Sequence, residues 1–525
     1  MAGFEPILYV YGPPGSGKTT VGQRLAEALA LPFCDLDDRI VAAAGCSIPE
    51  IFASEGEAGF RAREAAALNE AAAGKPQVVS LGGGALLNPA CRLTAESSGV
   101  VVCLSATVPL LAERLEGAAG TRPLLGGRLE QEARLAALME ARRAHYGSFP
   151  LQFDAHHTPD EIVWAISVRL GLFHVTGMGR GYDVRILPGG LDHLGELMKN
   201  RGLGGPVALV TDEHTAPLYA GRARAALEAA GYRVHAVSLP AGEASKTLAS
   251  AAKLWEEFLA GGLERGSTAV ALGGGVIGDL VGFAASAYLR GMRWVAAPTS
   301  LLAMVDAGLG GKTAIDLPQG KNLIGAFHPP ALVLSDPEVL ASLPEPELRN
   351  GLAEVAKHGL LRDPALFAEC AQGWEALQGG DWTGLVRRGA AVKVRYILAD
   401  PYEHGERAAL NLGHTIGHAV ESASQFRLRH GEAVSIGLVA AARLGVRTGL
   451  CSPALVEEIQ VALHELGLPI SLPDWIDPAQ VLPLLQLDKK KRGGQVRFVL
   501  PIKVGEVRHG VALDLDLDTL IEVTR

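Results

Sequence analysis

Cysteines, aromatic residues and long apolar runs are all scarce in this chain of 525 residues, and each shortage excludes a class of protein. The six cysteines include no C-x-x-C pair and are too few for a disulfide scaffold, which favours a reducing cytoplasm. No stretch is long and apolar enough to span a bilayer, and the N-terminus lacks the pattern of an export signal. We therefore expect a cytoplasmic protein with no membrane partner.

Charge of either sign is not concentrated anywhere along the chain. The net charge is −9 and no long acidic or basic run occurs, so we expect no nucleic-acid partner. Hydrophobic residues make up 48% of the chain and charged residues 20%, a balance typical of compact α/β proteins. Since domains usually contain roughly 100–200 residues, a chain of this length should fold as several domains that act on small molecules.

Strand-like and helix-like segments alternate through the first part of the chain. The apolar run 7–11 leads through a glycine-rich turn into a helical stretch, 21–30, and further strand-like runs cover 78–81 and 100–104. This alternation predicts a parallel sheet covered by helices over residues 1–172. Four glycines within 171–181 then predict a linker, which we place at 173–180.

A second α/β pattern begins after the predicted linker. Strands expected at 207–211, 234–239 and 268–272, with helices between them, resemble a Rossmann-like dinucleotide-binding domain, which we place at 181–340. Beyond about residue 340 strand signals fade until 496–500, so a mainly α-helical domain is expected over 341–525.

A phosphate-binding loop occupies residues 12–19. The segment G-P-P-G-S-G-K-T lies after a predicted strand and before a predicted helix, which is the context that G-x-x-x-x-G-K-[ST] requires. Its amides would surround phosphates, its lysine would reach the β and γ phosphates of ATP, and its threonine would hold Mg²⁺. The residues predicted to bind ATP and Mg²⁺ here are Gly15, Ser16, Gly17, Lys18, Thr19 and Thr20.

Segments further along identify the acceptor of the phosphoryl group. They are D-L-D at 35–37, G-F-R-A-R-E at 59–64, S-L-G-G-G at 80–84, T-R-P-L-L at 121–125, and Arg142 four residues before Tyr146. In order and spacing they resemble shikimate kinase, a P-loop kinase fold, over residues 1 to about 172. The resemblance implies ATP-dependent 3-phosphorylation of shikimate.

That resemblance also assigns the residues of the first site. Asp37 would orient and deprotonate the acceptor hydroxyl, and a lid carrying Arg122 would place its guanidinium on the transferred phosphoryl group beside Lys18. Asp35 would contact the Mg²⁺ shell. The groups expected to bind shikimate are Asp37, the carboxylate fork Arg61 and Arg142, and the backbone of Gly82, Gly83 and Gly84.

Glycines and histidines mark a second site. Residues 273–278 satisfy G-x-G-x-x-G after a predicted strand, although a tight structural turn would explain this pattern alone equally well. His414 and His418 share one helix face, so spacing alone pairs them as metal ligands, with Thr415 replacing the Glu of H-E-x-x-H. With His430 and the carboxylate of Glu354, they predict a metal held by two histidines and a carboxylate.

Cationic residues recur beside these motifs in numbers that suit a phosphorylated substrate. Together with G-G-G-V-I-G-D-L at 273–280, P-T-S-L-L-A-M-V-D at 298–306, G-K-N-L-I-G-A-F-H-P at 320–329, E-V-A-K at 354–357 and N-L-G-H-T-I-G-H-A at 411–419, they resemble 3-dehydroquinate synthase over residues 177–525. The implied reaction converts 3-deoxy-D-arabino-heptulosonate 7-phosphate to 3-dehydroquinate with release of phosphate, using NAD as a catalyst. Both halves would then serve chorismate and aromatic amino acid biosynthesis.

The second resemblance replaces the pairing suggested by spacing. It implies that Glu354, His414 and His430 hold Zn²⁺ or Co²⁺, that His418 acts in acid–base catalysis together with Glu403, and that Lys312 is a further catalytic residue. Its NAD positions are Asp212, Glu243, Lys246, Gly274, Gly275, Val276, Asp279, Thr299, Ser300 and Lys321. Its sugar-phosphate positions are Arg290, Asp306, Lys312, Asn322, Lys357, Lys393, Arg407 and Asn411, with either Lys489 or Lys490.

Three alternatives remain open from the sequence. The two-domain arrangement expected for the rear half also fits an NAD- and metal-dependent polyol dehydrogenase, although the lysines of this half favour a phosphorylated substrate. Another sugar-phosphate cyclase, acting on a substrate without a carboxylate, would use similar cations, and either half could be a degenerate binding module. Beyond the small-molecule substrates, the expected partner is a second copy of the chain, paired through the synthase half.

Overall fold

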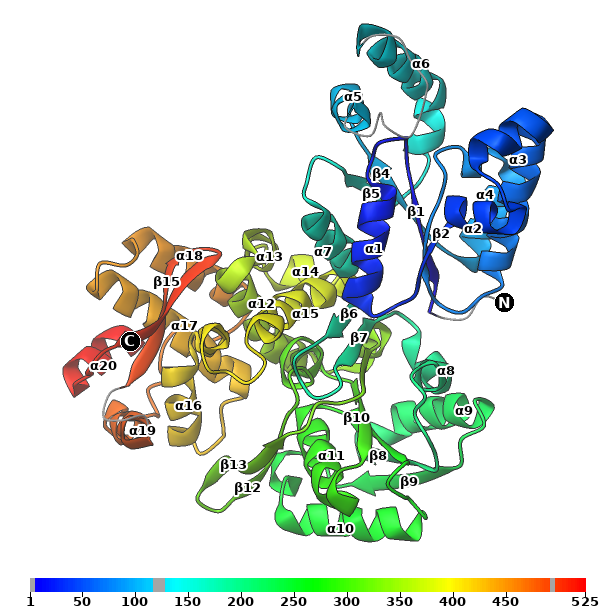
Figure 1. The fold of residues 1–525 in the computed structure, drawn as a ribbon. Helices are drawn as coiled ribbons and strands as arrows, with labels where there is room; N and C mark the ends of the chain where they lie inside the picture. The colour runs from blue at the N-terminus through cyan, green and yellow to red at the C-terminus, as the bar shows by residue number, and fades with distance from the viewer. Residues whose placement is uncertain (1–4, 117–127, 492–495) are drawn as a thin grey trace. The chain divides into compact units, whose positions relative to one another are not determined.

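The computed structural model describes residues 5–116, 128–491 and 496–525 (Figure 1). The chain divides into two compact units, Met1–His174 and Val175–Arg525. The division falls within strand β6 (Leu172–Val175). The apolar residues of β6 are buried, although the glycines around it suggested a linker. Residues 173–175 of the expected linker are therefore strand.

A five-stranded parallel sheet forms the centre of the first unit, as predicted, with the order β2-β3-β1-β4-β5. Its strands are β1 (Ile7–Tyr11), β2 (Phe33–Asp35), β3 (Val78–Ser80), β4 (Gly99–Ser105) and β5 (Gln152–Asp154). Every residue of β1 is buried, as expected of a central strand covered on both faces. The loop that follows β1 therefore lies beside the carboxyl ends of the neighbouring strands.

Helices connect these strands. They are α1 (Lys18–Leu29), α2 (Leu36–Ala44), α3 (Ile48–Ala72), α4 (Pro89–Ser98), α5 (Val108–Glu116), α6 (Arg128–Gly147) and α7 (Pro159–Leu170), with a short turn η1 (Ala85–Leu87). Helix α1 buries Val21, Leu25 and Leu29, which recur at helical spacing on one face. The helical prediction for 21–30 is confirmed by this helix.

The second unit begins with another parallel sheet, whose strands run in the order β7-β14-β11-β10-β8-β9. They are β7 (Tyr182–Ile186), β8 (Val207–Asp212), β9 (Val234–Leu239), β10 (Thr268–Gly273), β11 (Arg293–Pro298) and β14 (Leu332–Ser335). The three strands predicted from sequence are confirmed. Because β9 and β10 lie on opposite sides of β8, the chain reverses direction across the sheet between β8 and β10, where such folds bind ligands.

Helices and one hairpin surround this sheet. The longer helices are α8 (Leu194–Asn200), α9 (Gly221–Ala229), α10 (Leu248–Ala260) and α11 (Gly275–Ala287), and the short turns are η2 (Gly190–His193), η3 (Ala216–Ala220), η4 (Glu243–Ser245), η5 (Tyr288–Arg290), η6 (Ala303–Ala307) and η7 (Pro337–Ser342). Strands β12 (Lys312–Leu317) and β13 (Gly320–Phe327) form a separate antiparallel hairpin beside α11 (Figure 1). No strand was predicted from the sequence for these residues.

The rest of the second unit is mainly helical, as predicted. It comprises α12 (Glu345–Arg362), α13 (Pro364–Cys370), α14 (Trp374–Leu377), α15 (Trp382–Ala399), η8 (Glu406–Asn411), α16 (His414–Ala423), α17 (His430–Arg447), α18 (Pro453–Glu465), α19 (Pro478–Lys491), a hairpin of β15 (Arg497–Lys503) and β16 (Glu506–Ala512), and α20 (Leu517–Thr524). Helix α12 is buried on all sides from Asn350 to Leu361, so its polar residues lie inside the protein. Within the described ranges, no helix is both long and apolar enough to cross a membrane.

Candidate active sites

The phosphate loop joins β1 to α1, as the sequence predicted. Gly12, Gly15 and Gly17 all have positive φ, a backbone conformation that residues with a side chain rarely adopt. A Cβ on Gly12 would also meet the Leu104 carbonyl oxygen at 2.6 Å. Gly17 caps α1 without a side-chain hydrogen bond, so the first amides of the helix are free of a side-chain cap. The loop therefore presents backbone donors and a helix dipole to an anion.

Thr19 and Asp35 meet at the carboxyl ends of the central strands. The Thr19 hydroxyl donates to Asp35 Oδ2 at 2.9 Å, and Asp35 Oδ1 accepts the amide of Asp37 at 3.0 Å. The Lys18 ammonium donates to the Pro13 carbonyl at 2.9 Å, while the buried Ser16 hydroxyl has no hydrogen-bond partner among the described residues. A hydroxyl and a carboxylate side by side suit a hydrated Mg²⁺ ion, and the Ser16 hydroxyl suits a phosphate oxygen.

The glycines after β3 lie against the groups predicted to bind the acceptor. A Cβ on Gly82 would lie 3.5 Å from Asp37 Oδ1, and one on Gly84 would lie 2.8 Å from an Arg61 guanidinium nitrogen. Arg61 in turn donates at 2.6 Å to Glu64, a buried carboxylate for which the sequence predicted no role. Burial raises the pKa of Glu64 even though Arg61 opposes that change. Because a buried carboxylate holds Arg61, its guanidinium is fixed beside the glycines.

The Gly83 carbonyl collects donors from two distant elements. Arg142 Nη1 donates to it at 3.1 Å, the Tyr146 hydroxyl at 2.7 Å and the Tyr11 hydroxyl at 3.3 Å. The Tyr11 hydroxyl also lies 3.0 Å from His145 Nε2. A side chain on Gly83 would meet the phosphate loop, with the Gly12 carbonyl oxygen 3.2 Å from its Cβ. Gly83 therefore connects the phosphate loop to the residues expected around shikimate.

Replacing Tyr11 by Phe should weaken binding of the acceptor without preventing phosphoryl transfer. Loss of one hydrogen bond, worth about 1 kcal/mol, should raise KM for shikimate roughly 3- to 10-fold with kcat nearly unchanged. Tyr9→Phe is the matched control, because Tyr9 is equally buried on β1 but its hydroxyl contacts Ser98, at 2.7 Å. Steady-state kinetics of both variants would contradict this role for Tyr11 if KM rose equally in the two.

Two further arginines complete the first unit. The predicted lid residue Arg122 lies outside the described residues. Arg114 of α5, which the sequence analysis did not single out, donates to the Ser16 carbonyl at 3.4 Å and to the Ala155 carbonyl at 2.8 Å. Arg114 therefore stabilises the backbone of the phosphate loop at Ser16.

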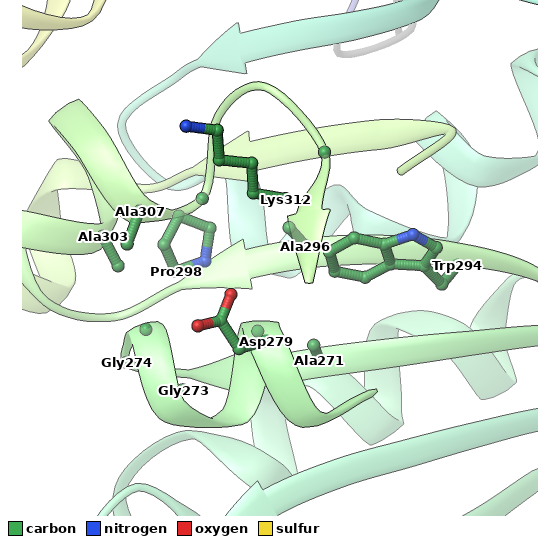
Figure 2. A pocket seen from close by; sticks show the side chains of 14 residues that line it. Ala271, Gly273, Gly274, Asp279, Trp294, Ala296, Pro298, Ala303, Ala307 and Lys312 are labelled. Carbon is green, nitrogen blue, oxygen red and sulfur yellow. The ribbon is translucent and has the colours of Figure 1, made fainter. Parts of the chain in front are cut away.

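The glycine motif of the second unit joins β10 to α11, as predicted. Gly274 caps α11 without a side-chain hydrogen bond, and a Cβ on Gly275 would meet Ala307 Cβ at 3.2 Å. Figure 2 shows the pocket at this turn, with the Asp279 carboxylate pointing toward Pro298. The pocket is lined by Ala271, Gly273, Gly274, Gly275, Gly278, Asp279, Trp294, Ala296, Pro298, Ala303, Ala307, Gly308, Gly311 and Lys312. Val276 lies in the first turn of the same helix.

Other predicted NAD residues follow the neighbouring strands. Asp212 ends β8, and Thr299 and Ser300 follow β11, so both flank the Gly273 turn. The Asp212 carboxylate accepts the amides of His214 at 2.9 Å and of the next residue at 2.8 Å, which closes its own turn. The Thr299 amide donates to the Gly273 carbonyl at 3.0 Å. These groups lie at the switch point of the sheet, where a dinucleotide is expected.

A buried lysine links the pocket to the hairpin. The Lys246 ammonium lies 2.5 Å from Asp279 Oδ2 and also donates to Asn322 Oδ1 on β13. Glu243 lies 3.9 Å from the same ammonium. Burial raises the pKa of Asp279, with Lys246 acting against it. Asn322, predicted to bind the sugar phosphate, is thus placed among residues predicted to bind NAD.

Glu354, His414 and His430 converge from α12, α16 and α17. Their possible ligand atoms lie within 4.8 Å of one another, and Glu354 Oε1 is 3.4 Å from His414 Nε2 and 3.6 Å from His430 Nε2. Those are the separations expected of ligands that each lie about 2 Å from one tetrahedral ion. Glu354 is completely buried, and its Oε2 contacts the Lys357 ammonium while its Oε1 faces the two imidazoles. A metal ion at Oε1 would therefore be the cation between this carboxylate and the histidines.

The two histidines present the same nitrogen to that centre. His414 Nδ1 lies 3.1 Å from the Leu412 carbonyl and donates to it, which leaves Nε2 as the ligand atom. Burial lowers the pKa of His430, but its contacts with Glu354 and Glu421 outweigh burial and raise that pKa to about 9. The surrounding carboxylates therefore favour positive charge at this position.

A second possible ligand group is less suited to a metal ion. Asp306, Glu354 and His358 also have ligand atoms within 4.8 Å of one another. However, the Lys357 ammonium contacts Glu354, and the Lys393 ammonium lies 2.7 Å from Asp306 Oδ1. The oxygens that face His358, Glu354 Oε2 and Asp306 Oδ1, are therefore each already paired with a lysine. Glu354 Oε1 faces the other two histidines instead, so we place the metal at Glu354, His414 and His430.

His418 lies beside the metal group but outside it. Its ring centroid is 5.0 Å from that of His414 and 5.8 Å from that of His430, and its side chain is exposed. Glu403, the expected proton-transfer partner, contacts the Lys312 ammonium and accepts from Asn411 Nδ2 at 3.0 Å. His418 is therefore accessible to a substrate at the metal.

The remaining predicted substrate residues divide into three groups. Arg407 is buried and donates to the carbonyls of Pro401 and, at 3.4 Å, Gly310, so it lies near the Lys312 strand. Arg290 lies on the exposed turn η5 with a φ of 68° and belongs to none of the clusters above. The side chains of Lys489 and Lys490 lie outside the described residues.

Comparison with known proteins divides the chain in the same way. A shikimate kinase family model matches residues 14–169, and models of the N-terminal and C-terminal parts of 3-dehydroquinate synthase match 236–350 and 351–491. The 3-dehydroquinate synthase of Symbiobacterium thermophilum is 48% identical over 303 residues, covering 57% of this chain and 85% of its own.

Solved structures resemble the rear half at lower identity. A 2-epi-5-epi-valiolone synthase from Streptomyces hygroscopicus, with NAD⁺ and Zn²⁺ bound, is 29% identical with a TM-score of 0.58, covering 65% of this chain and 95% of that one. A 2-deoxy-scyllo-inosose synthase, complexed with carbaglucose-6-phosphate, NAD⁺ and Co²⁺, is 26% identical with a TM-score of 0.60, covering 67% and 99%.

Proposed function

Because the chain belongs to the 3-dehydroquinate synthase family and carries a shikimate kinase domain ahead of that part, we propose residue roles for two active sites in one bifunctional enzyme. The enzyme phosphorylates shikimate with ATP and forms 3-dehydroquinate from the heptulosonate phosphate. Both reactions belong to the shikimate pathway, which leads to chorismate and the aromatic amino acids. The observation that carries the proposal for the rear half is the completely buried Glu354 carboxylate, whose Oε1 lies near the Nε2 atoms of two histidines.

In the kinase site, Lys18 and the loop amides bind the phosphates of ATP, and Thr19 and Asp35 hold Mg²⁺. Arg61 and Arg142 bind the carboxylate of shikimate. Asp37 accepts the proton of the attacking hydroxyl, since its carboxylate lies at the glycines that surround the acceptor. The positive charges around the phosphoryl group stabilise its transfer, and Arg122 is proposed to add another from the lid.

In the synthase site, the turn at Gly274 and the strand ends around it bind NAD, and Glu354, His414 and His430 bind Zn²⁺ or Co²⁺, the partners carried by the related cyclases. When bound, NAD⁺ accepts and returns a hydride, and the metal lowers the pKa of a substrate hydroxyl. The cations of this region bind phosphate and carboxylate. They are Lys312, Lys357, Lys393 and Arg407, with Arg290 and one of Lys489 and Lys490 proposed from the family pattern.

Proton transfers in this site are assigned to His418 and Glu403. His418 is exposed beside the metal ligands, so its imidazole can exchange a proton with bound substrate. Glu403 contacts Lys312 and Asn411. Burial alone would raise the pKa of the Glu403 carboxyl, but these contacts outweigh burial and lower that pKa. Glu403 is therefore a carboxylate at neutral pH and accepts protons.

A comparison of two substrates tests the synthase assignment against another cyclase and against a polyol dehydrogenase. With the heptulosonate phosphate, the protein should release phosphate without net formation of NADH. Glucose 6-phosphate lacks the carboxylate, so cations placed for that group would stay unpaired and kcat/KM should be lower by roughly 10⁴-fold. Equal phosphate release from both substrates would favour a different cyclase, and net NADH would favour a dehydrogenase.

We also propose where and with what the enzyme works. All six cysteines lie in the described residues as free thiols, which supports a cytoplasmic location. The dispersed charge of the chain supports the proposal that it has no nucleic-acid or membrane-surface partner. A homodimer through the synthase half is proposed as the assembly, and sedimentation of the intact chain would distinguish it from a monomer. The proposed domains are 1–172, 181–340 and 341–525, and the linker between the first two is shortened to 176–180 because β6 ends at Val175.

A further inference from the structure

Glu421 on α16 has a position that the roles above leave unexplained. Its side chain is buried, although it carries a charge and lies three residues beyond His418 and seven beyond His414 on one helix face. Its two oxygens have different partners. Oε1 accepts from the Lys321 ammonium at 2.8 Å, and Oε2 lies 3.3 Å from His430 Nδ1.

The second of these contacts orients a proposed metal ligand. With Nδ1 donating to Glu421, His430 turns Nε2 toward Glu354 Oε1, 3.6 Å away. A carboxylate behind a histidine ligand fixes the ring and makes the ligand nitrogen more basic, and its loss typically weakens metal binding 10- to 100-fold. His414 has only the neutral Leu412 carbonyl in the equivalent place. Glu421 is thus the charged support of this centre.

The first contact reaches the dinucleotide site. Lys321 lies on β13, and its ammonium is 3.8 Å from Glu243 of η4 and 4.2 Å from the centroid of the Phe426 ring. Glu243 and Lys321 are both proposed NAD residues. The Lys321 ammonium therefore lies between Glu243, a proposed NAD residue, and Glu421, the carboxylate that supports His430.

We propose that Glu421 is a positioning residue that orients the metal ligand His430 and, through Lys321, couples metal binding to NAD⁺ binding. The inference rests on the proposed function, because it takes NAD⁺ and a divalent metal as the ligands. The phosphates of NAD⁺ attract Lys321 away from Glu421, so the carboxylate acts more strongly on His430 and the metal binds more tightly. Linkage then requires the metal to tighten NAD⁺ binding by the same factor.

The test is the Zn²⁺ dissociation constant of the full-length protein, measured by competition with a chromophoric chelator, with and without saturating NAD⁺. For the unaltered protein, NAD⁺ should tighten Zn²⁺ binding about fivefold or more. Glu421→Gln should weaken Zn²⁺ binding about 10- to 100-fold and remove the effect of NAD⁺. Lys321→Met should keep tight Zn²⁺ binding and also remove the effect of NAD⁺.

Glu369→Gln is the matched control, since Glu369 is a half-buried carboxylate paired with Arg388 at 2.6 Å, outside the clusters of the active site. It should behave as the unaltered protein. A Glu421→Gln protein with unchanged Zn²⁺ affinity would overturn the positioning role, and unaltered protein with no effect of NAD⁺ would overturn the coupling. If the unaltered protein bound neither ligand, the proposed function itself would fail.

A spectroscopic variant of the experiment covers the case in which Glu421→Gln does not fold. Glu421→Asp keeps the charge but shortens the side chain, so it cannot hold Lys321 and His430 at their present distances. In the Co²⁺-loaded protein, this change should shift the visible absorption bands, and NAD⁺ should no longer alter them. Bands identical to those of the unaltered protein would overturn the inference.

Discussion

Lys18→Ala should abolish phosphorylation of shikimate and leave the release of phosphate from the heptulosonate phosphate unchanged. Lys18 extends from the phosphate loop, and its ammonium donates to the Pro13 carbonyl of that loop at 2.9 Å. Removal of a cation that acts on the transferred phosphoryl group should lower kcat by about 10²–10³-fold or more. ADP formation and phosphate release, measured separately on one preparation, check the prediction.

Lys75→Ala is the control for this experiment. Lys75 is an exposed lysine of the same unit and lies outside the phosphate loop, so both activities should be unchanged when it is replaced. Loss of both activities in Lys18→Ala, with Lys75→Ala unaffected, would contradict two independent sites and indicate that the units depend on each other.

His414→Ala and His418→Ala should abolish synthase turnover for different reasons. His414 Nε2 lies 3.4 Å from Glu354 Oε1, so its loss should remove Zn²⁺ from the protein. His418 belongs to the same helix, one turn later, but lies outside the ligand group. Its loss should leave one Zn²⁺ per chain bound, while turnover falls by about 10²–10⁴-fold, as expected for an acid–base residue.

Metal analysis of the two purified variants distinguishes these outcomes, and their shikimate kinase activities report on folding of the rest of the chain. A His418→Ala protein without zinc would restore the pairing of His414 with His418 that sequence spacing alone suggests. A His414→Ala protein that retained zinc would contradict the metal site itself.

The sequence predicted the fold well wherever a local pattern and the final structure coincide. Central strands such as β8 and β10 are largely continuous apolar runs because both faces of the sheet are covered, so they are recognisable without knowledge of their neighbours. The hairpin β12–β13 was missed because its second strand is largely exposed and interrupted by glycine, which removes the alternation typical of strands. Strand β6 was read as linker because it has only four residues and glycines lie close to both of its ends.

The candidate active sites were likewise predictable from the sequence where a short motif marks them. The phosphate loop and the Gly274 turn place their own backbone, so a short motif is enough to locate them. Glu64 and Glu421, in contrast, are single carboxylates in helices, where most such residues face water. Their role depends on which arginine, lysine or histidine the rest of the fold places beside them, and spacing along the chain carries no information about that.

The central claim is that one polypeptide carries two working active sites, and a paired assay of the intact purified chain tests it most directly. One preparation is given ATP and shikimate, and then the heptulosonate phosphate with NAD⁺ and Zn²⁺, while ADP and phosphate are measured. We predict shikimate-dependent ADP in the first reaction and phosphate release without net NADH in the second. Absence of either product from protein that is folded and loaded with metal would contradict the account.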